Sequence, residues 1–98
     1  MKIVFSYKSR QDIDDIFIWI SRENVTIAQE VETKIRSACE NLAEFPFASS
    51  DTNEDDIRRA PISQLPYTIF FRVNNSIKTI EIARITHGSQ VQNLRKLP

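Results

Sequence analysis

The stretch YTIFFRVNNSIKTIEIARITHG, residues 67–88, decides the fold of this 98-residue chain. Aromatic and β-branched residues dominate 67–73, and this composition predicts a strand. Asn74 and Asn75 follow it and tolerate the positive φ angles of a two-residue hairpin turn. The next residues, 76–86, are again rich in isoleucine and threonine, so they form the partner strand of a β-hairpin.

The second of these strands changes phase along its length. Ile80 and Ile82 share one face, whereas Ile85 falls on the other face. A strand with this pattern is either covered on both faces or interrupted by a β-bulge. Helices on one side leave the opposite face uncovered, so we expect Phe70 or its neighbours to meet solvent or a partner chain.

Two helices precede the hairpin. Residues 2–7 alternate as a short strand, and Ser9 with Asp12 has the spacing of a capping box at a helix start. Apolar residues recur at helical spacing through Ile20, and Asn24 is the expected N-cap of a second, longer helix. The short link predicts an antiparallel helical hairpin.

Residues 47–56 are polar and acidic, which predicts an exposed loop. A weak strand follows over 57–63, and Pro61 confines it to a sheet edge or a bulge. The expected fold is therefore α+β with the order β-α-α-β-β-β. An N-terminal strand and an antiparallel helical hairpin precede a three-stranded antiparallel meander, and the hairpin packs on one sheet face. Residues 1–98 form a single domain.

Composition narrows the function. Thirteen basic and thirteen acidic residues leave a formal charge of zero, so the chain alone has no electrostatic signature for binding DNA or an anionic membrane. A single cysteine excludes an intrachain disulfide framework and suits a reducing compartment. The absence of a signal peptide and of a membrane-spanning stretch predicts a cytoplasmic protein.

Few residues are candidates for catalysis or cofactor binding. One glycine cannot form a glycine-rich phosphate loop, and one histidine with one cysteine does not make a metal site, so we expect no cofactor and no metal. A Cys39–His87 nucleophilic pair is formally possible, but Cys39 lies on the apolar stripe of a helix and is expected to be structural. The acidic run 54–56 is expected to be solvated.

Arginines on the expected strands are more informative. Arg58, Arg59, Arg72 and Arg84 all fall on strands, where a sheet can bring them to one face. Together with Tyr67 and His87 they could grip phosphate or carboxylate groups. The equally weighted alternative is that each arginine pairs with a neighbouring side chain and does nothing further.

Five segments together resemble the RelE/ParE toxin superfamily, and its ParE-like branch in particular. They are DIDDIFIWI (12–20), AQEVETKIRSACENLAEFP (28–46), an arginine at 58 or 59, LPYTIFF (65–71) and IEIARITHG (80–88). Each motif is weak alone, and the ordered set extends over nearly the whole chain.

The resemblance implies the toxin of a type II toxin–antitoxin system, neutralised by a ParD-like antitoxin, a small DNA-binding protein that covers apolar surface of the toxin. ParE-like members inhibit DNA gyrase by binding, whereas RelE-like members cleave messenger RNA in the ribosome. A neutral chain favours the gyrase inhibitor over an enzyme that must hold RNA phosphates. The alternatives are a ribosome-dependent endoribonuclease and a non-toxic member that only binds antitoxin.

Two departures from the family pattern stand out. Gln90 occupies a position near the end where the family often has arginine, and the usual glycine after Pro46 is absent. The missing arginine weakens any mechanism that needs a C-terminal cation. His87 is therefore expected to end its strand, with Gly88 allowing the turn, and not to act as a catalyst.

The expected contacts follow from these arguments. Candidate gyrase contacts are Arg58, Arg59, Tyr67, Arg72 and Arg84. Candidate antitoxin contacts are Phe17, Trp19 and Phe70. If the protein is instead a nuclease, its catalytic candidates are His87, Arg84, Arg59 and Tyr67. The identity of the antitoxin and the oligomeric state of the complex are left open.

Overall fold

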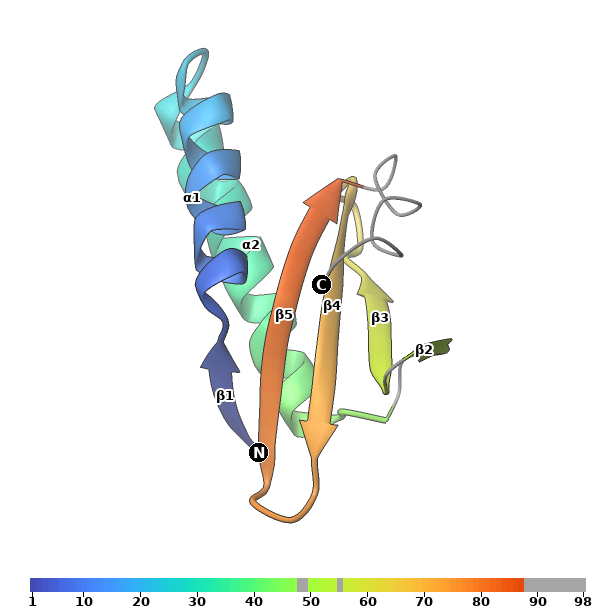
Figure 1. The fold of residues 1–98 in the computed structure, drawn as a ribbon. Coiled ribbons are helices and arrows are strands. Elements are labelled where there is room, and N and C mark those ends of the chain that lie inside the picture. The colour runs from blue at the N-terminus through green and yellow to red at the C-terminus, as the bar shows by residue number, and fades with distance from the viewer. Residues whose placement is uncertain (48–49, 55, 88–98) are drawn as a thin grey trace.

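The computed structural model describes residues 1–47, 50–54 and 56–87, and it contains two helices packed on one face of a five-stranded mixed sheet (Figure 1). The strands lie in the order β1-β5-β4-β3-β2, with β1 parallel to β5 and every other pair antiparallel. The predicted α+β arrangement is confirmed, with one strand more than expected. In chain order the elements are β1 (Lys2–Phe5), α1 (Tyr7–Ser21), α2 (Val25–Glu44), β2 (Ser50–Glu54), β3 (Ile57–Pro61), β4 (Tyr67–Asn74) and β5 (Thr79–His87).

The additional strand is β2, and the prediction of a loop throughout 47–56 is wrong there. β2 pairs with β3 through Ser50 opposite Arg59 and Asp51 opposite Arg58. Side-chain composition did not indicate a strand. The backbone groups on the outer edge of β3 need hydrogen-bond partners whatever the side chains are, and a polar segment can supply them.

The strand that contains Pro61 is not at the edge of the sheet, because β2 lies outside β3, but Pro61 itself lies beyond the described pairs of β2 with β3. The N–H of Ile62 donates to the carbonyl of Tyr67 at 2.9 Å, so by alternation the backbone of Pro61 faces away from β4. Proline has no N–H to offer at that position. The outer edge of β3 beyond Arg59 therefore lacks a donor that an added strand would use.

The first helix begins earlier than predicted. Ser6, and not Ser9, is its N-cap: the Ser6 side chain accepts the N–H of Ser9 at 3.0 Å, and the Ser9 hydroxyl returns a bond to the Ser6 carbonyl. The expected strand over 2–7 accordingly ends at Phe5, and Tyr7 is already helical. Asp12 is too far into the helix to cap it and is available for another partner.

Asn24 caps the second helix as predicted, because its side-chain oxygen accepts the N–H of Ile27 at 3.0 Å. Only two residues separate this cap from the end of α1, so the helices return antiparallel and pack against each other. Figure 1 shows that the turn between them projects beyond the ends of the strands. The tip of the helical hairpin therefore lies outside the core.

The core lies between α2 and the sheet. Phe71, Ile80 and Ile82 are fully buried there, together with Ile85 at 2% exposure. Ile85 reaches the same face as Ile82 because the register shifts between them: Phe70 is opposite Arg84, whereas Phe71 is opposite Ile82. The phase change read in the sequence is thus a β-bulge, one of its two predicted explanations.

The turn between β4 and β5 is longer than predicted. Asn74 ends β4, and four residues, 75–78, connect it to Thr79. The Asn74 side chain accepts the N–H of Ser76 at 3.0 Å, and Lys78 takes the left-handed conformation at φ 54°. The expected two-residue turn is wrong because Asn74 folds the chain with its side chain while remaining in the strand.

Candidate functional site

The four strand arginines do not converge on one face. Arg58 is opposite core residue Phe71, and its guanidinium lies over the ring of Phe47 at 5.0 Å. Arg59, the next residue, points to the other face, where its cross-strand neighbour is Phe70. Neighbouring arginines of one strand are thus divided between the two sides of the sheet.

Arg72 lies on β4 with its guanidinium 3.3 Å from the carboxylate of Glu81 on β5. The two residues are directly opposite each other in the strand register, and both side chains are nearly half exposed. A cross-strand pair of this kind contributes at most about 1 kcal/mol because water screens it. The ion pair nevertheless engages the guanidinium of Arg72, which was a candidate contact for the target.

Arg84 is held most firmly. Its Nε and Nη2 atoms donate to the two carboxylate oxygens of Asp12 at 2.7 and 3.0 Å, and Asp12 Oδ2 also accepts the backbone N–H of Ile85 at 2.9 Å. These hydrogen bonds raise the pKa of Arg84 above its ordinary value, so the guanidinium stays charged. Arg84 therefore links α1 to β5.

Ser6 also binds backbone carbonyl groups on this edge of β5. Its N–H donates to the carbonyl of Ile82 at 3.0 Å and its hydroxyl donates to the carbonyl of Ala83 at 2.8 Å. β1 stops at Phe5, which is opposite Ile82, so beyond that point Ser6 and Asp12 supply the partners that a longer strand would give. Side chains of α1 thus close an otherwise open sheet edge.

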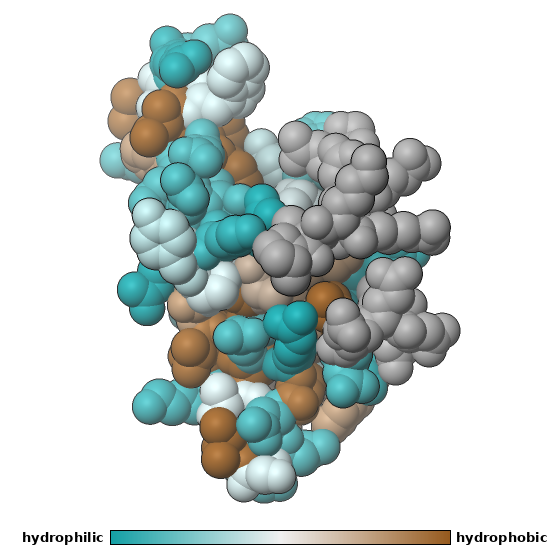
Figure 2. Space-filling view, viewed as in Figure 1, coloured by the Kyte–Doolittle hydropathy of each residue, from teal (hydrophilic) through white to brown (hydrophobic). Residues whose placement is uncertain are grey.

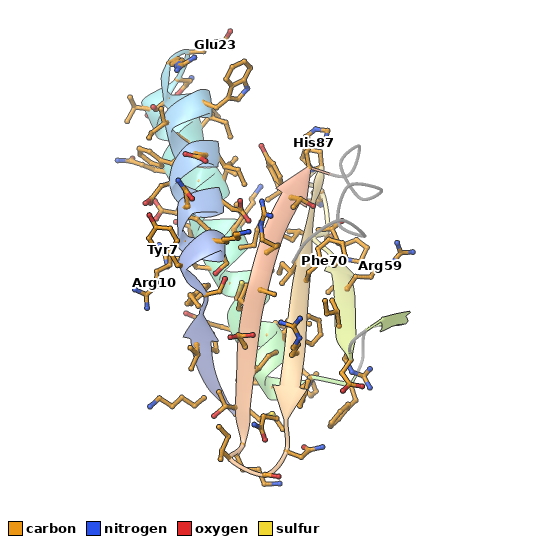
Figure 3. All side chains as sticks on the ribbon, viewed as in Figure 1. Tyr7, Arg10, Glu23, Arg59, Phe70 and His87 are labelled. Atoms are coloured by element: carbon orange, nitrogen blue, oxygen red, sulfur yellow. The ribbon has the colours of Figure 1, made fainter. Side chains whose placement is uncertain are left out.

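Tyr67 and His87 meet at one end of the β4–β5 pair, where they are directly opposite each other. Their ring centroids are 5.8 Å apart with an interplanar angle of 87°, an edge-to-face contact. Partial burial raises the pKa of the Tyr67 hydroxyl above its usual value, so it remains a neutral hydrogen-bond donor. His87 is exposed at the end of β5, and Arg59 lies lower, beside Phe70 (Figure 3).

Of the nuclease candidates, the structure therefore brings only Tyr67 and His87 into contact. Arg84 is bonded to Asp12, and Arg59 is on β3 and points to the face opposite the core. Cys39 is fully buried in the core, whereas His87 is exposed, so the possible Cys39–His87 pair does not form. Burial raises the pKa of the Cys39 thiol from 9.0 to about 12, which keeps it protonated and unreactive.

The three candidate antitoxin contacts differ in exposure. Trp19 is 68% exposed, with the guanidinium of Arg22 lying 5.6 Å from the centre of its ring, and Phe17 is half-buried. Phe70 faces away from the core, as expected, but its side chain is only 5% exposed, so the prediction that it meets solvent is wrong. Only Trp19 offers a large accessible surface.

A groove between α2 and β3 was not predicted from the sequence. It has a volume of about 820 Å³, and α2 borders it from Thr33 to Phe45, while β3 and the following loop border it from Arg59 to Gln64. Its apolar lining includes the buried side chains of Leu42, Ile62 and Ile69 and the exposed ring of Phe45. The signal that could have indicated it is the series of small or short polar residues on the groove side of α2: Thr33, Ser37, Ala38 and Asn41.

No cluster of three or more potential metal ligands occurs among the residues that the structure describes. Of the acidic run 54–56, only the side chain of Asp56 lies within the described residues, and it is exposed. Gln90, whose identity departs from the family pattern, lies outside them. Within the described part of the chain, neither helix is long and apolar enough to cross a membrane.

Solved structures of other proteins share this small α+β fold. Among solved structures, the chain is similar to one from the chromosomal ParDE system of P. aeruginosa, with a TM-score of 0.76 and 21% identity over 89% of this chain and 95% of that one. It is also similar to a chain of the RelBE2 toxin–antitoxin complex of Mycobacterium tuberculosis, with a TM-score of 0.68 and 13% identity over 88% and 95% of the two chains. A YoeB/ParE toxin from Agrobacterium tumefaciens matches with a TM-score of 0.61 and 19% identity over 89% and 98%.

The sequence comparisons identify the family. Residues 3–92 match the family described as the ParE toxin of the type II toxin–antitoxin system parDE, so the chain belongs to the ParE toxin family. A Sinorhizobium fredii protein named "Putative toxin Y4kP" is 24% identical over 89 residues, which cover 91% of this chain and 90% of that protein.

Proposed function

We propose that this protein is the toxin of a type II toxin–antitoxin pair and that it inhibits DNA gyrase by binding, without catalysing a reaction. The observation that carries the first part is the family match over residues 3–92. The second part rests on how the charged side chains are distributed, because a binder needs a few accessible anchors, whereas an RNA-cleaving enzyme needs clustered cations.

The charge distribution favours binding. The chain has a formal charge of zero, and Arg72 and Arg84 are each engaged by an acidic side chain. Cleavage of a phosphodiester passes through a charged transition state, which cations must stabilise. Within the described part of the chain, the strand arginines are not clustered around Tyr67 and His87 to supply those cations. Arg59, which is exposed, is the best-placed anchor for a protein target.

The groove between α2 and β3 is the proposed seat of the antitoxin. An amphipathic segment can place its apolar side chains on Leu42, Ile62 and Ile69, and the small residues of α2 allow its backbone to approach closely. Lys34 of α2 borders the same groove, so an acidic residue on the segment would be attracted to it.

The decisive experiment runs two assays on the same preparation. Purified gyrase is tested for DNA supercoiling, and programmed ribosomes are tested for messenger cleavage. We expect supercoiling to stop and messenger RNA to stay intact. Codon-phased cleavage with unaffected supercoiling would overturn the gyrase proposal while leaving the toxin–antitoxin assignment in place.

The contact between Tyr67 and His87 is the observation that keeps ribosomal cleavage as the second candidate, since histidine is the side chain most often used for acid–base catalysis. His87→Gln separates the two. In a gyrase inhibitor the variant should retain most of its growth inhibition. Loss of toxicity in a His87→Gln protein that still folds and binds antitoxin would favour the nuclease.

A further inference from the structure

An apolar surface covers the tip of the helical hairpin, away from the groove. Four residues make up this tip patch, and their exposed fractions are 53% for Ile18, 68% for Trp19, 53% for Val25 and 43% for Ile27. Hydrophobic side chains are visible on the hairpin near this end of the molecule (Figure 2). Exposed single residues need no explanation, but four large ones at one turn mark a contact surface.

A hollow of about 380 Å³ lies within the same surface. It is lined by Trp19 and Ile20 at the end of α1, by Ile27 at the start of α2, and by Arg22, Glu23 and Asn24 between them. The hollow is held in shape by the Asn24 cap and by the contact of Arg22 with the Trp19 ring. A projecting aromatic ring thus lies next to a preformed recess.

We propose that the tip patch is where two copies of this chain associate about a two-fold axis. In a two-fold contact each residue meets the same surface of the other copy, so a surface that carries both a projection and a recess complements itself. Trp19 of each copy would lie in the hollow of the other. Tryptophan and arginine are also the side chains that most often dominate the energy of an interface.

The charges of the tip fit a second copy. Arg22 and Glu23 are adjacent and opposite in sign, and Figure 3 shows Glu23 at the extreme end of the hairpin. Across the axis, Arg22 of one copy faces Glu23 of the other, giving two equivalent ion pairs. The formal charge of zero means that two chains do not repel each other.

This contact does not use the groove proposed for the antitoxin, and it gives Trp19, which the sequence analysis expected to contact the antitoxin, a different partner. The groove involves α2 only from Thr33 onward, whereas the tip patch ends at Ile27, so the two surfaces share no residue. The patch is small beside the roughly 800 Å² per partner of a standard interface, so we expect a dissociation constant of tens of micromolar.

The single tryptophan of the chain makes the test direct, since Trp19 fluorescence reports only on the patch. Protein from cell-free synthesis is examined by sedimentation velocity and by emission spectra over a wide concentration range. We expect the mass to rise from 11.4 kDa toward twice that value, with emission shifting to shorter wavelength over the same range. Ile18→Glu should abolish both changes. Ile77→Glu, which charges a side chain in the β4–β5 turn that is 67% exposed against 53% for Ile18, should abolish neither.

Charge reversal identifies the partner as a second copy. Arg22→Glu should weaken association about tenfold by placing like charges opposite each other, and the double variant Arg22→Glu/Glu23→Arg should restore most of it. A chain that remains monomeric at several hundred micromolar would overturn the proposal. So would a monomeric chain whose antitoxin binding is lost in Ile18→Glu, because the patch would then belong to the antitoxin.

Discussion

The carboxylate of Asp12, in the second turn of α1, holds both the guanidinium of Arg84 and the backbone N–H of Ile85 on β5. One side chain therefore fastens a helix to a strand 72 residues further along the chain. Its side chain is 13% exposed and that of Arg84 is 24% exposed, so the pair is well shielded from water. Hydrogen bonds to charged groups at such positions are among the stronger single contributions to stability.

Replacing Asp12 should therefore destabilise the whole domain. Asp12→Asn removes the negative charge and leaves Arg84 half-buried without its counter-ion, at a cost of about 2 kcal/mol in the free energy of unfolding. For a domain of this size the melting temperature should fall by about 8 to 16 °C. Asp14→Asn, an exposed residue of the same helix, is the matched control and should melt with the wild type. Equal melting temperatures for both variants would contradict the role given to Asp12.

Substitutions of Arg84 and of Arg59 should have different effects, the first on stability and the second on target binding. Arg84→Ala should lower the melting temperature, and Arg84→Lys should recover only part of it because lysine cannot make the bidentate contact with Asp12. Arg59→Ala should leave stability unchanged, since this side chain is exposed, but should weaken gyrase inhibition at least fivefold. Supercoiling assays with thermal melts of each variant provide the check. Full inhibition by Arg59→Ala would remove Arg59 as an anchor.

The groove can be tested by filling it. Ser37→Trp places a large ring on the groove side of α2, so it should abolish antitoxin binding while leaving the melting temperature within a few degrees of wild type. Growth inhibition by this variant should then persist when antitoxin is co-expressed. Glu40→Trp, an exposed position of α2 that does not border the groove, should still be neutralised. Neutralisation of the Ser37→Trp variant would place the antitoxin elsewhere.

Cys39 should be inert and should make stability fall at high pH. Its pKa in the folded protein is about 12, against 9.0 when unfolded, so the folded state retains its proton longer. The contribution is fully present below pH 9 and is lost as the pH rises from 9 toward 12, because the unfolded chain then ionises first. The free energy of unfolding of wild type and Cys39→Ala should differ by a constant amount below pH 9, and the difference should change only in this window. Thiol labelling at pH 8 should require denaturant, and labelling of the folded protein would contradict the buried position.

Local patterns predicted the elements that local chemistry determines. Two strands were predicted at 67–73 and 76–86 and lie at 67–74 and 79–87. The helical hairpin and the Asn24 cap were also predicted, and the bulge near Ile85 was one of two explanations offered for the change of phase. The start of α1 was misplaced because Ser6 and Ser9 are both plausible caps. Only the tertiary contact of Ser6 with β5 decides between them.

The candidate site was less predictable because it depends on contacts distant in sequence. No sequence pattern near Arg84 predicts that Asp12 will bind it, because the two residues meet only when α1 lies along β5. The face on which each arginine points follows from strand register, which sets Arg58 and Arg59 apart. The groove lies between α2 and β3, and the composition of either segment alone does not predict a space between them.

The contacts of Ser6 and Asp12 with the edge of β5 also determine when the domain can fold during its synthesis. Among the described strands, β1 pairs only with β5. Ser6 binds the carbonyl of a residue 77 positions later, and Asp12 binds a side chain 72 positions later. The N-terminal segment therefore emerges from the ribosome long before its partners exist. Contacts of such long range slow folding, so the sheet cannot be completed until the last strand has been translated. A nascent or prematurely terminated chain would lack the assembled domain, which delays any toxicity until translation has passed β5.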